Sequence, residues 1–180
     1  MKTLSLKCPT GYLHKVVSNQ YISKAKSINL TMKNSTKCVI TALSIVAVAG
    51  IGSIFTSIGQ EWYSPLEKPT QWPPSFIFPV VWSAIYLLAF IVLCRAISND
   101  TATKSLFVWG VINGILNVLW CLVFFTLKLT FVGVVVIVFN AVASVVFVRQ
   151  IEGKIQYAMW IYPLWVMLAT MLNVAVWILN

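Results

Sequence analysis

Five apolar stretches, each about as long as a membrane-spanning helix, dominate the sequence. They run over residues 38–59, 74–94, 105–127, 129–148 and 155–179. None contains an internal Lys, Arg, Asp or Glu, and about 20 helical residues cross the ~30 Å hydrocarbon core of a bilayer. The strands of a membrane barrel would alternate polar and apolar side chains, and these stretches do not alternate. The sequence therefore predicts an all-α membrane protein, a bundle of five transmembrane helices.

The low charge content excludes most other classes of protein. Charged residues make up only 9% of the chain and hydrophobic residues 59%, whereas an ordinary soluble domain is roughly 25% charged. Thirteen basic and four acidic residues cannot cover the surface of a water-soluble fold of 180 residues. This composition excludes a soluble enzyme, a disordered chain and a coiled coil. The net charge of +9 does not indicate nucleic-acid binding, because the basic surplus precedes a hydrophobic segment.

The N-terminal part of the chain is strongly basic. Residues 1–37 hold seven lysines and no acidic residue, so we predict a basic N-terminal extension followed by a transmembrane domain over residues 38–180. Two interpretations of residues 1–31 stay open. They form a targeting extension, or they are not translated because synthesis starts at Met32.

The distribution of basic residues also predicts the orientation in the membrane. The extension together with the loops 95–104 and 149–154 holds eleven basic residues, and the opposite side holds only Lys68 and Lys128. Loops that remain in the cytoplasm carry the excess of Lys and Arg. We therefore predict the N-terminus inside, the C-terminus outside and the loop 61–74 outside.

Several kinds of chemistry have no residues to support them. The apolar stretches contain no carboxylate or histidine, groups that ion-coupled transporters use within the membrane. No phosphate-binding loop, metalloprotease or serine-hydrolase motif occurs. The four cysteines are scattered without a Cys-x-x-Cys pair, and the only histidine, His14, lies in the extension. We therefore predict neither a disulfide framework nor a metal site.

The apolar stretches also carry aromatic and amide side chains on shared helical faces. Most of the eight tryptophans fit the aromatic belt at a membrane surface, but Trp82, Trp120 and Trp165 lie deeper. Residues three or four apart share a helical face, and three such faces are Pro79, Trp82, Ser83 and Tyr86; Asn113, Asn117 and Trp120; and Tyr162, Trp165, Ala169 and Asn173. Two interpretations of these faces stay open. They form the wall of a largely apolar ligand pocket with a few polar anchors, or their amides serve only to bond neighbouring helices.

Two further features bear on such a pocket. The loop 61–74 reads EWYSPLEKPTQWPP, and its four prolines and two tryptophans make it stiff and amphipathic. It is either a lid above the layer of Trp82 and Trp120 or an interfacial anchor. Gly110 and Gly114 form a GxxxG pattern, which allows close approach of helices. Packing within the bundle and dimerisation both remain open for this pair.

Several motifs occur in a fixed order between residue 45 and residue 180. WYSPLEKP at 62–69 looks like the WYxxLxKP motif of the translocator protein family, whose members are also called tryptophan-rich sensory proteins or peripheral-type benzodiazepine receptors. Further matches to that family are Pro73-Pro74, Val81-Trp82 and Tyr86, then Leu116-Asn117, Trp120 and Phe124-Phe125, and finally Trp165, Ala169, Leu172-Asn173, Trp177 and Leu179-Asn180. The sequence thus resembles this family everywhere except in the extension.

The resemblance implies a five-helix bundle that is commonly dimeric and lies in a bacterial cell envelope, which we favour, or in a mitochondrial outer membrane. It implies a cavity under the first loop that binds tetrapyrroles such as protoporphyrin IX or haem. The matching positions place Trp62 and Tyr63 in the lid. They place these residues in the cavity wall: Trp82, Asn113, Asn117, Trp120, Trp165, Ala169 and Asn173.

We therefore expect a membrane protein that binds tetrapyrroles or similar flat hydrophobic molecules, with a sensory, regulatory or carrier role in tetrapyrrole metabolism. It needs no cofactor, and porphyrin is its ligand. The expected partners are this ligand, membrane lipid and a second copy of the chain, with no nucleic acid. One alternative is a light-dependent porphyrin-degrading enzyme that uses Trp82 and Trp165 as redox partners. The other is a lipid- or sterol-binding scaffold whose dimer is set by Gly110 and Gly114.

The sequence departs from the family pattern at several positions. Asn113 replaces a glutamine found in many members, and its shorter amide still donates and accepts hydrogen bonds. Asn140 replaces a tryptophan of the fourth helix. The ending ATMLNVAVWILN lacks the Tyr-then-Arg of the vertebrate cholesterol motif, which argues against specific cholesterol binding.

Overall fold

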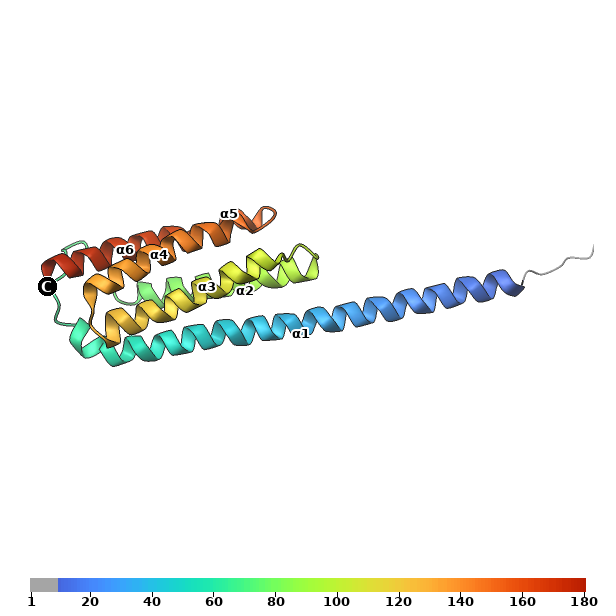
Figure 1. The fold of residues 1–180 in the computed structure, drawn as a ribbon, viewed down its shortest axis with the longest axis horizontal. Helices are drawn as coiled ribbons and strands as arrows, with labels where there is room; N and C mark the ends of the chain where they lie inside the picture. Colours follow the sequence, from blue (N-terminus) through green and yellow to red (C-terminus); the bar gives the residue numbers. More distant parts are fainter. Residues whose placement is uncertain (1–9) are drawn as a thin grey trace, which may run out of the picture.

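The computed structural model describes the backbone of residues 10–180 and the side chains of residues 33–180. The described part of the chain is helical and contains no strand. Its helices are α1 (Thr10–Tyr63), α2 (Ile77–Ser98), α3 (Lys104–Cys121), the π-helix η1 (Leu122–Thr126), α4 (Thr130–Arg149), α5 (Ile155–Met159) and α6 (Ile161–Leu179). Figure 1 shows α1 continuing well beyond the bundle that the other helices form.

Five segments are long and apolar enough to cross a membrane, which confirms the predicted architecture. They are Lys33–Tyr63, Ile77–Ser98, Lys104–Thr126, Thr130–Arg149 and Ile155–Leu179. The side chains of residues 1–32 lie outside the described part. The interpretations of residues 1–31 as a targeting extension or as a segment before a start at Met32 therefore stay predictions.

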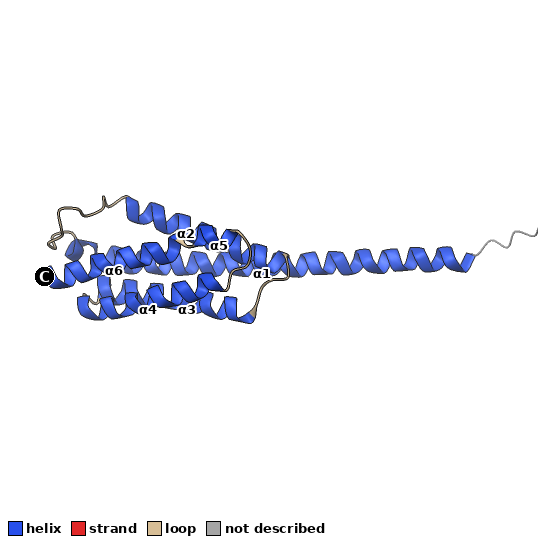
Figure 2. Cartoon of the chain, turned by 90° about the horizontal axis from the view of Figure 1, so that it is seen from above, coloured by secondary structure: helices blue, strands red, loops and turns tan. Residues whose placement is uncertain are grey.

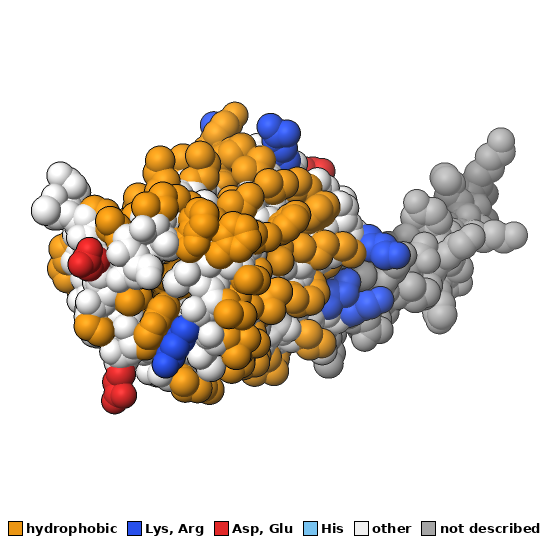
Figure 3. Space-filling view, turned by 60° about the vertical axis from the view of Figure 1, so that its left-hand side comes forward, with side chains coloured by type: hydrophobic (Ala, Val, Ile, Leu, Met, Phe, Trp, Pro, Cys, Tyr) orange, Lys and Arg blue, Asp and Glu red, His pale blue; other side chains and the backbone are white. Residues whose placement is uncertain are grey.

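The helices of the bundle lie side by side (Figure 2), and successive spanning segments run in opposite directions (Figure 1). The bundle therefore has two ends, which differ in their charged residues. At the basic end lie Lys37, Arg95, Lys104, Arg149 and Lys154, each at or next to the end of a spanning segment. The opposite end, here called the loop end, carries the loop 64–76. Figure 3 shows a broad apolar surface between the ends, with the Lys and Arg side chains toward its margins. This surface suits the hydrocarbon of a bilayer.

The helix α1 is longer than predicted at the loop end. It continues to Tyr63, so Trp62 and Tyr63 lie in its last turn, whereas the sequence placed them in the loop. The turn is held by aromatic packing, since the Trp62 ring lies 5.9 Å from that of Phe124 and the Tyr63 ring 5.2 Å from that of Phe125. Pro65 follows and cannot supply the backbone N–H that would extend the helix.

The third spanning segment ends in a π-helix that the sequence did not predict. Leu127 N donates to Leu122 O at 2.9 Å, five residues back, and the wider turn buries both Phe124 and Phe125. Gly59 of α1 packs directly against the backbone of Phe125. A Cβ added to this glycine would lie only 2.6 Å from the carbonyl carbon of Phe125. A left-handed residue, Lys128 with φ +59°, then turns the chain into α4.

The last spanning segment is interrupted near its start. α5 ends at Met159, and α6 begins at Ile161. The sequence predicted one continuous helix over 155–179. Pro163 explains the interruption, because its ring nitrogen cannot donate a hydrogen bond to the carbonyl of Met159.

The two glycines of the GxxxG pattern face neighbours within the bundle. A Cβ on Gly114 would lie 3.1 Å from Cγ2 of Val48 in α1, and one on Gly110 would lie 3.5 Å from Cε2 of Phe147 in α4. The distance at Gly114 shows that this glycine permits close packing of α3 on α1 inside one copy, whereas the distance at Gly110 is an ordinary van der Waals contact. Dimerisation through the same pair stays a prediction.

Candidate functional site

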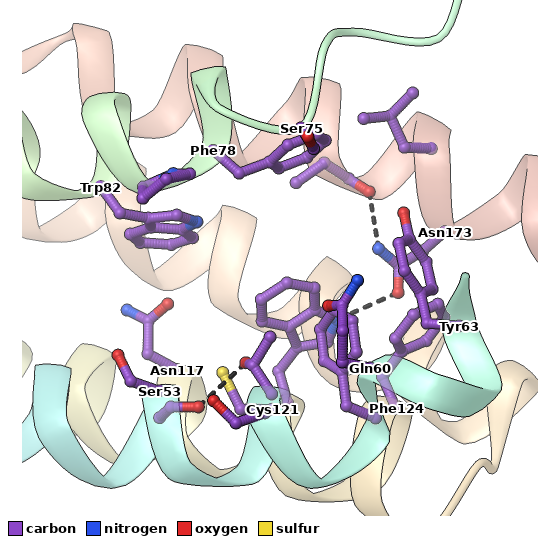
Figure 4. A pocket seen from close by; sticks show the side chains of 18 of the residues that line it. Ser53, Gln60, Tyr63, Ser75, Phe78, Trp82, Asn117, Cys121, Phe124 and Asn173 are labelled. Atoms are coloured by element: carbon purple, nitrogen blue, oxygen red, sulfur yellow. Dashed lines mark hydrogen bonds between the residues drawn. The ribbon is translucent and has the colours of Figure 1, made fainter.

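A cavity of about 640 Å³ lies inside the bundle toward the loop end. Figure 4 shows Phe78 and Trp82 of α2 on one side of it and Asn117, Cys121 and Phe124 on the other, with Asn173 of α6 near Tyr63. α1 contributes small and polar side chains to the wall, namely Gly52, Ser53, Thr56, Ser57 and Gln60. The loop contributes Lys68, Trp72 and Pro73 to the wall. The cavity therefore adjoins the loop, and a lid role for the loop stays a prediction.

The centre of the wall is a set of stacked aromatic rings. The ring of Trp82 lies 5.7 Å from that of Tyr86 and is nearly parallel to it, with an interplanar angle of 28°. It also lies 6.4 Å from the ring of Trp120, which in turn stacks on Phe124 at 6.1 Å. The predicted layer of Trp82 and Trp120 is therefore present. Offset-stacked aromatic rings offer flat faces to a planar ligand.

The orientation of Trp120 is fixed by a hydrogen bond to α6. Its Nε1 donates to Oδ1 of Asn173 at 3.0 Å, and Nδ2 of Asn173 donates to the backbone oxygen of Ala169 at 2.8 Å. All three residues are buried. The indole can therefore not rotate without leaving a buried N–H unpaired, which holds its face toward the cavity.

A second polar cluster, centred on Tyr162, lies deeper in the bundle. Nδ2 of Asn117 donates to Oη of Tyr162 at 2.9 Å, and that hydroxyl donates to Oδ1 of Asn113 at 3.0 Å. Nδ2 of Asn140 donates to Oδ1 of Asn117 at 3.2 Å. The cluster joins α3, α4 and α6. The sequence singled out Asn140 only as a departure from the family pattern, although an amide in an apolar stretch signals an inward-facing position.

The predicted site residues divide into two groups. The cavity is lined by Tyr63, Trp82, Asn117, Trp120, Ala169 and Asn173. Trp62, Asn113 and Trp165 are not among the lining residues. Trp62 packs on Phe124, and Asn113 donates across the helix interface to the backbone oxygen of Ala143 at 3.1 Å. The two amides therefore have different surroundings. Asn117 lines the cavity, whereas Asn113 forms a hydrogen bond between neighbouring helices.

Trp165 lies behind Phe78, which separates it from the cavity. The two rings are 5.7 Å apart at an interplanar angle of 65°. Trp165 is buried, and its Nε1 has no hydrogen-bond partner within the described part of the chain. A buried N–H without a partner costs about 1–3 kcal/mol.

The loop over the cavity is fastened at two points. Nζ of Lys68 donates to the backbone oxygens of Tyr63, Ser64 and Leu66 at 2.9–3.0 Å, and lies 4.6 Å from the centre of the Tyr63 ring. The Asn180 side chain accepts from Glu67 N at 3.0 Å and donates to Glu67 O at 3.2 Å. Lys68 thus satisfies carbonyls at the end of α1, while Asn180 ties the loop to the end of α6. Burial lowers the pKa of the Lys68 ammonium.

The cavity wall carries few ionisable side chains. The lining residues include no carboxylate and no histidine, and Lys68 is their only cation. Among the described residues, no group of three His, Cys, Asp or Glu side chains could hold a metal ion. The described wall is suited to binding by ring stacking, amides and hydroxyls.

Comparison with known proteins agrees with the geometry. The sequence profile of the TspO/MBR family matches residues 40–178, which include every residue of the cavity wall. The chain belongs to the TspO/MBR family. It is 32% identical to Tryptophan-rich protein TspO of Archaeoglobus fulgidus over 154 residues, which cover 82% of this chain and 99% of the relative.

Two further relatives support the same assignment. The chain is 34% identical to Protein CrtK of Rhodobacter capsulatus over 141 residues, covering 74% of this chain and 87% of the relative. It is 29% identical to Tryptophan-rich sensory protein of Cereibacter sphaeroides over 116 residues, which cover 63% of this chain and 73% of the relative. This TspO/MBR protein is a multi-pass integral membrane protein. The two relatives from bacteria, Rhodobacter capsulatus and Cereibacter sphaeroides, support the bacterial cell envelope that the sequence analysis favoured.

The loop of this TspO/MBR protein should open more readily when Asn180 is changed. Asn180→Ala removes both side-chain bonds to the Glu67 backbone, each worth about 0.5–1.5 kcal/mol. We expect amide hydrogen exchange in the loop to accelerate by roughly tenfold or more, measured by mass spectrometry on a peptide that contains Glu67. Gln71→Ala, in an exposed position of the same loop, should leave the exchange rate as it is. Equal rates in wild type and Asn180→Ala would show that this contact does not fasten the loop.

Proposed function

We propose that the cavity at the loop end binds a tetrapyrrole such as protoporphyrin IX. The observation that carries the proposal is the stack of Tyr86, Trp82, Trp120 and Phe124 along a cavity of about 640 Å³. This volume is within the range of small-molecule sites, roughly 300–1,000 Å³. A flat and hydrophobic ring has large faces that aromatic side chains cover well.

The polar groups around the cavity suit the edges of such a ligand. Asn117 and Asn173 lie on the wall beside the indoles, and Gln60 and Lys68 lie toward the mouth. The two carboxylates of protoporphyrin IX would remain at the mouth, near the Lys68 ammonium and water, because carboxylates are costly to bury in an apolar interior. The ring itself would enter between α1 and the face of Trp82.

The same wall favours a binding role over a chemical one. It presents no carboxylate or imidazole among the described residues that line it, so a sensory, regulatory or carrier role fits better than acid–base catalysis. The name Tryptophan-rich sensory protein, carried by one relative, points in the same direction. A sensor needs a ligand-dependent change of shape, and the fastened loop above the cavity is the segment that a ligand at the mouth would touch.

A matched pair of cavity-filling substitutions tests the proposal. Both Ser53 of α1 and Ser83 of α2 are exposed, but only Ser53 lines the cavity. Ser53→Phe should block the space beneath the loop, and Ser83→Phe adds the same side chain to the outer surface. Protoporphyrin IX is titrated into each purified protein in detergent, and binding is followed by the porphyrin absorption band and by quenching of tryptophan fluorescence.

We expect saturable binding at micromolar ligand in the wild type and in Ser83→Phe, and at least tenfold weaker binding in Ser53→Phe, a difference of about 1.4 kcal/mol. Trp82→Phe should weaken binding by roughly two- to tenfold, because a ring–ring contact contributes about 0.5–1.5 kcal/mol. Trp165→Phe should change it less, since Phe78 lies between Trp165 and the cavity. Non-saturating quenching that is identical in all variants would mean partition into micelles and would overturn the proposal.

The same samples test the enzymatic alternative. Light-dependent loss of the porphyrin spectrum, abolished in Trp82→Phe while binding persists, would indicate porphyrin breakdown with an indole as redox partner. If the porphyrin spectrum of the wild type is stable in light, the enzymatic alternative fails and only the binding role is supported.

A further inference from the structure

The bundle contains a second cavity, of about 630 Å³, in the half nearer the basic end. It lies between α1, α2 and α3 and is here called the basic-end groove. Its wall includes Thr41, Ser44 and Val48 of α1, Ala89 of α2, and Gly110 and Gly114 of α3. Both glycines line the groove, where Gly114 lies close to Val48 of α1 and Gly110 faces Phe147 of α4.

The groove has a closed polar end and an open apolar side. Asn117 and Tyr86 belong to the walls of both cavities, so the cluster centred on Tyr162 separates the two. On the opposite side, Val111 and Ile115 line the groove and are 62% and 61% exposed. A groove bordered by exposed apolar side chains on a membrane-spanning surface opens toward the hydrocarbon rather than toward water.

The length of the groove matches one leaflet of a bilayer. Its α1 wall extends from Lys37 to Val48, and about 11 residues of helix at 1.5 Å each span ~16 Å. The hydrocarbon core is about 30 Å thick, so one leaflet contributes about half of that. An extended hydrocarbon chain that enters beside Lys37 would therefore reach the polar cluster near the middle of the membrane.

Charge at the mouth selects among amphiphiles. Lys37 lines the groove at its open end, and Arg95 and Lys104 lie at the same end of the bundle. A phosphate group beside Lys37 is attracted to its ammonium, at about 1 kcal/mol for a Lys or Arg near an anionic surface.

From these observations we propose that the basic-end groove binds one acyl chain of an anionic phospholipid, with the headgroup phosphate beside Lys37. The site differs from the cavity proposed for tetrapyrroles and does not depend on it. The bound acyl chain would occupy the groove between α1, α2 and α3.

The test compares lipid retention by native mass spectrometry. The purified protein is exchanged into detergent with phosphatidylglycerol or with phosphatidylcholine of identical acyl chains. Lys37→Gln removes the charge at the mouth, and Lys128→Gln removes an exposed charge at the loop end as its control. Ala89→Phe fills the groove, while Ala84→Phe adds the same ring at an exposed position of α2 outside the groove. Helical circular dichroism and size-exclusion profiles verify that each variant is folded.

We expect the wild type and both controls to retain one phosphatidylglycerol per chain, with at least fivefold preference over phosphatidylcholine. Lys37→Gln should reduce that preference to near equality, and Ala89→Phe should lose the bound lipid of either type. Should Ala89→Phe fail to fold, the loss of preference in Lys37→Gln still decides the question. Three outcomes would each overturn the proposal. The wild type retains both lipids equally, Lys37→Gln shows the same series of lipid adducts as the wild type, or the protein is a dimer without bound lipid. Porphyrin binding measured on the same variants reports separately on the other cavity.

Discussion

Replacement of Gly59 by alanine is expected to destabilise the protein by more than about 3 kcal/mol. A Cβ at this position would lie 2.6 Å from the carbonyl carbon and 2.7 Å from Cβ of Phe125, and would overlap the carbonyl oxygen as well. These are mostly backbone atoms of η1, which cannot move aside as a flexible side chain could. α1 would have to separate from η1, and overpacking of this kind costs typically 1–3 kcal/mol and occasionally more.

The measurement is the apparent melting temperature in detergent. For a protein of this size, 3 kcal/mol corresponds to a decrease of roughly 6–12 °C. Gly50→Ala is the matched control, because a Cβ on Gly50 meets no atom within 4 Å. It should leave the melting temperature unchanged or raise it, since alanine favours a helix over glycine by up to about 1 kcal/mol. A Gly59→Ala protein as stable as the wild type would contradict the close contact between α1 and η1.

Asn117→Ala is expected to lower stability by about 1–3 kcal/mol. The substitution removes the donor to Tyr162 Oη and the acceptor of Asn140 Nδ2, and both of these groups are buried. An unpaired buried polar group costs about 1–3 kcal/mol in proteins generally, whereas helix-to-helix hydrogen bonds in a membrane average about 0.6 kcal/mol with a maximum near 1.7. Two lost contacts place the expected effect at about 2 kcal/mol, or roughly 4–8 °C.

A double-mutant cycle separates the network from simple loss of volume. If Asn117 and Asn140 act together, Asn140→Ala in the Asn117→Ala background should cost less than Asn140→Ala alone. Asn99→Ala, at an exposed position after α2, provides the surface control and should have no measurable effect. Strict additivity of the Asn117 and Asn140 substitutions would show that the cluster is not an energetic unit. The same variants should also alter porphyrin binding, because Asn117 lines the cavity.

The bundle could be predicted from local properties of the chain. Length, apolar composition and the absence of internal charge fix where helices cross the membrane, because an unpaired charge or backbone group in hydrocarbon is costly. Helical spacing placed Asn113, Asn117 and Trp120 on one face, and all three are buried. It also placed Trp82 and Trp120 in one layer, as their ring separation of 6.4 Å confirms.

Other features depend on contacts between segments that are far from one another in the sequence. Whether Trp165 reaches the cavity is decided by Phe78 of another helix, and helical spacing alone contains no information on such a neighbour. The part that Asn140 plays in the polar cluster follows from the positions of Tyr162 and Asn117. The fastening of the loop by Asn180 joins residues 113 positions apart.

The sequence by itself determined the five spanning helices, their inward polar faces and the family, because helix periodicity and the energetics of apolar solvation act over a few neighbouring residues. Only the tertiary structure decided the rest: the π-helix that accommodates Gly59, the shielding of Trp165, and the division of the interior into two cavities by the cluster around Tyr162. These features arise from side chains that meet across helices, and their geometry is set by the packing of the whole bundle.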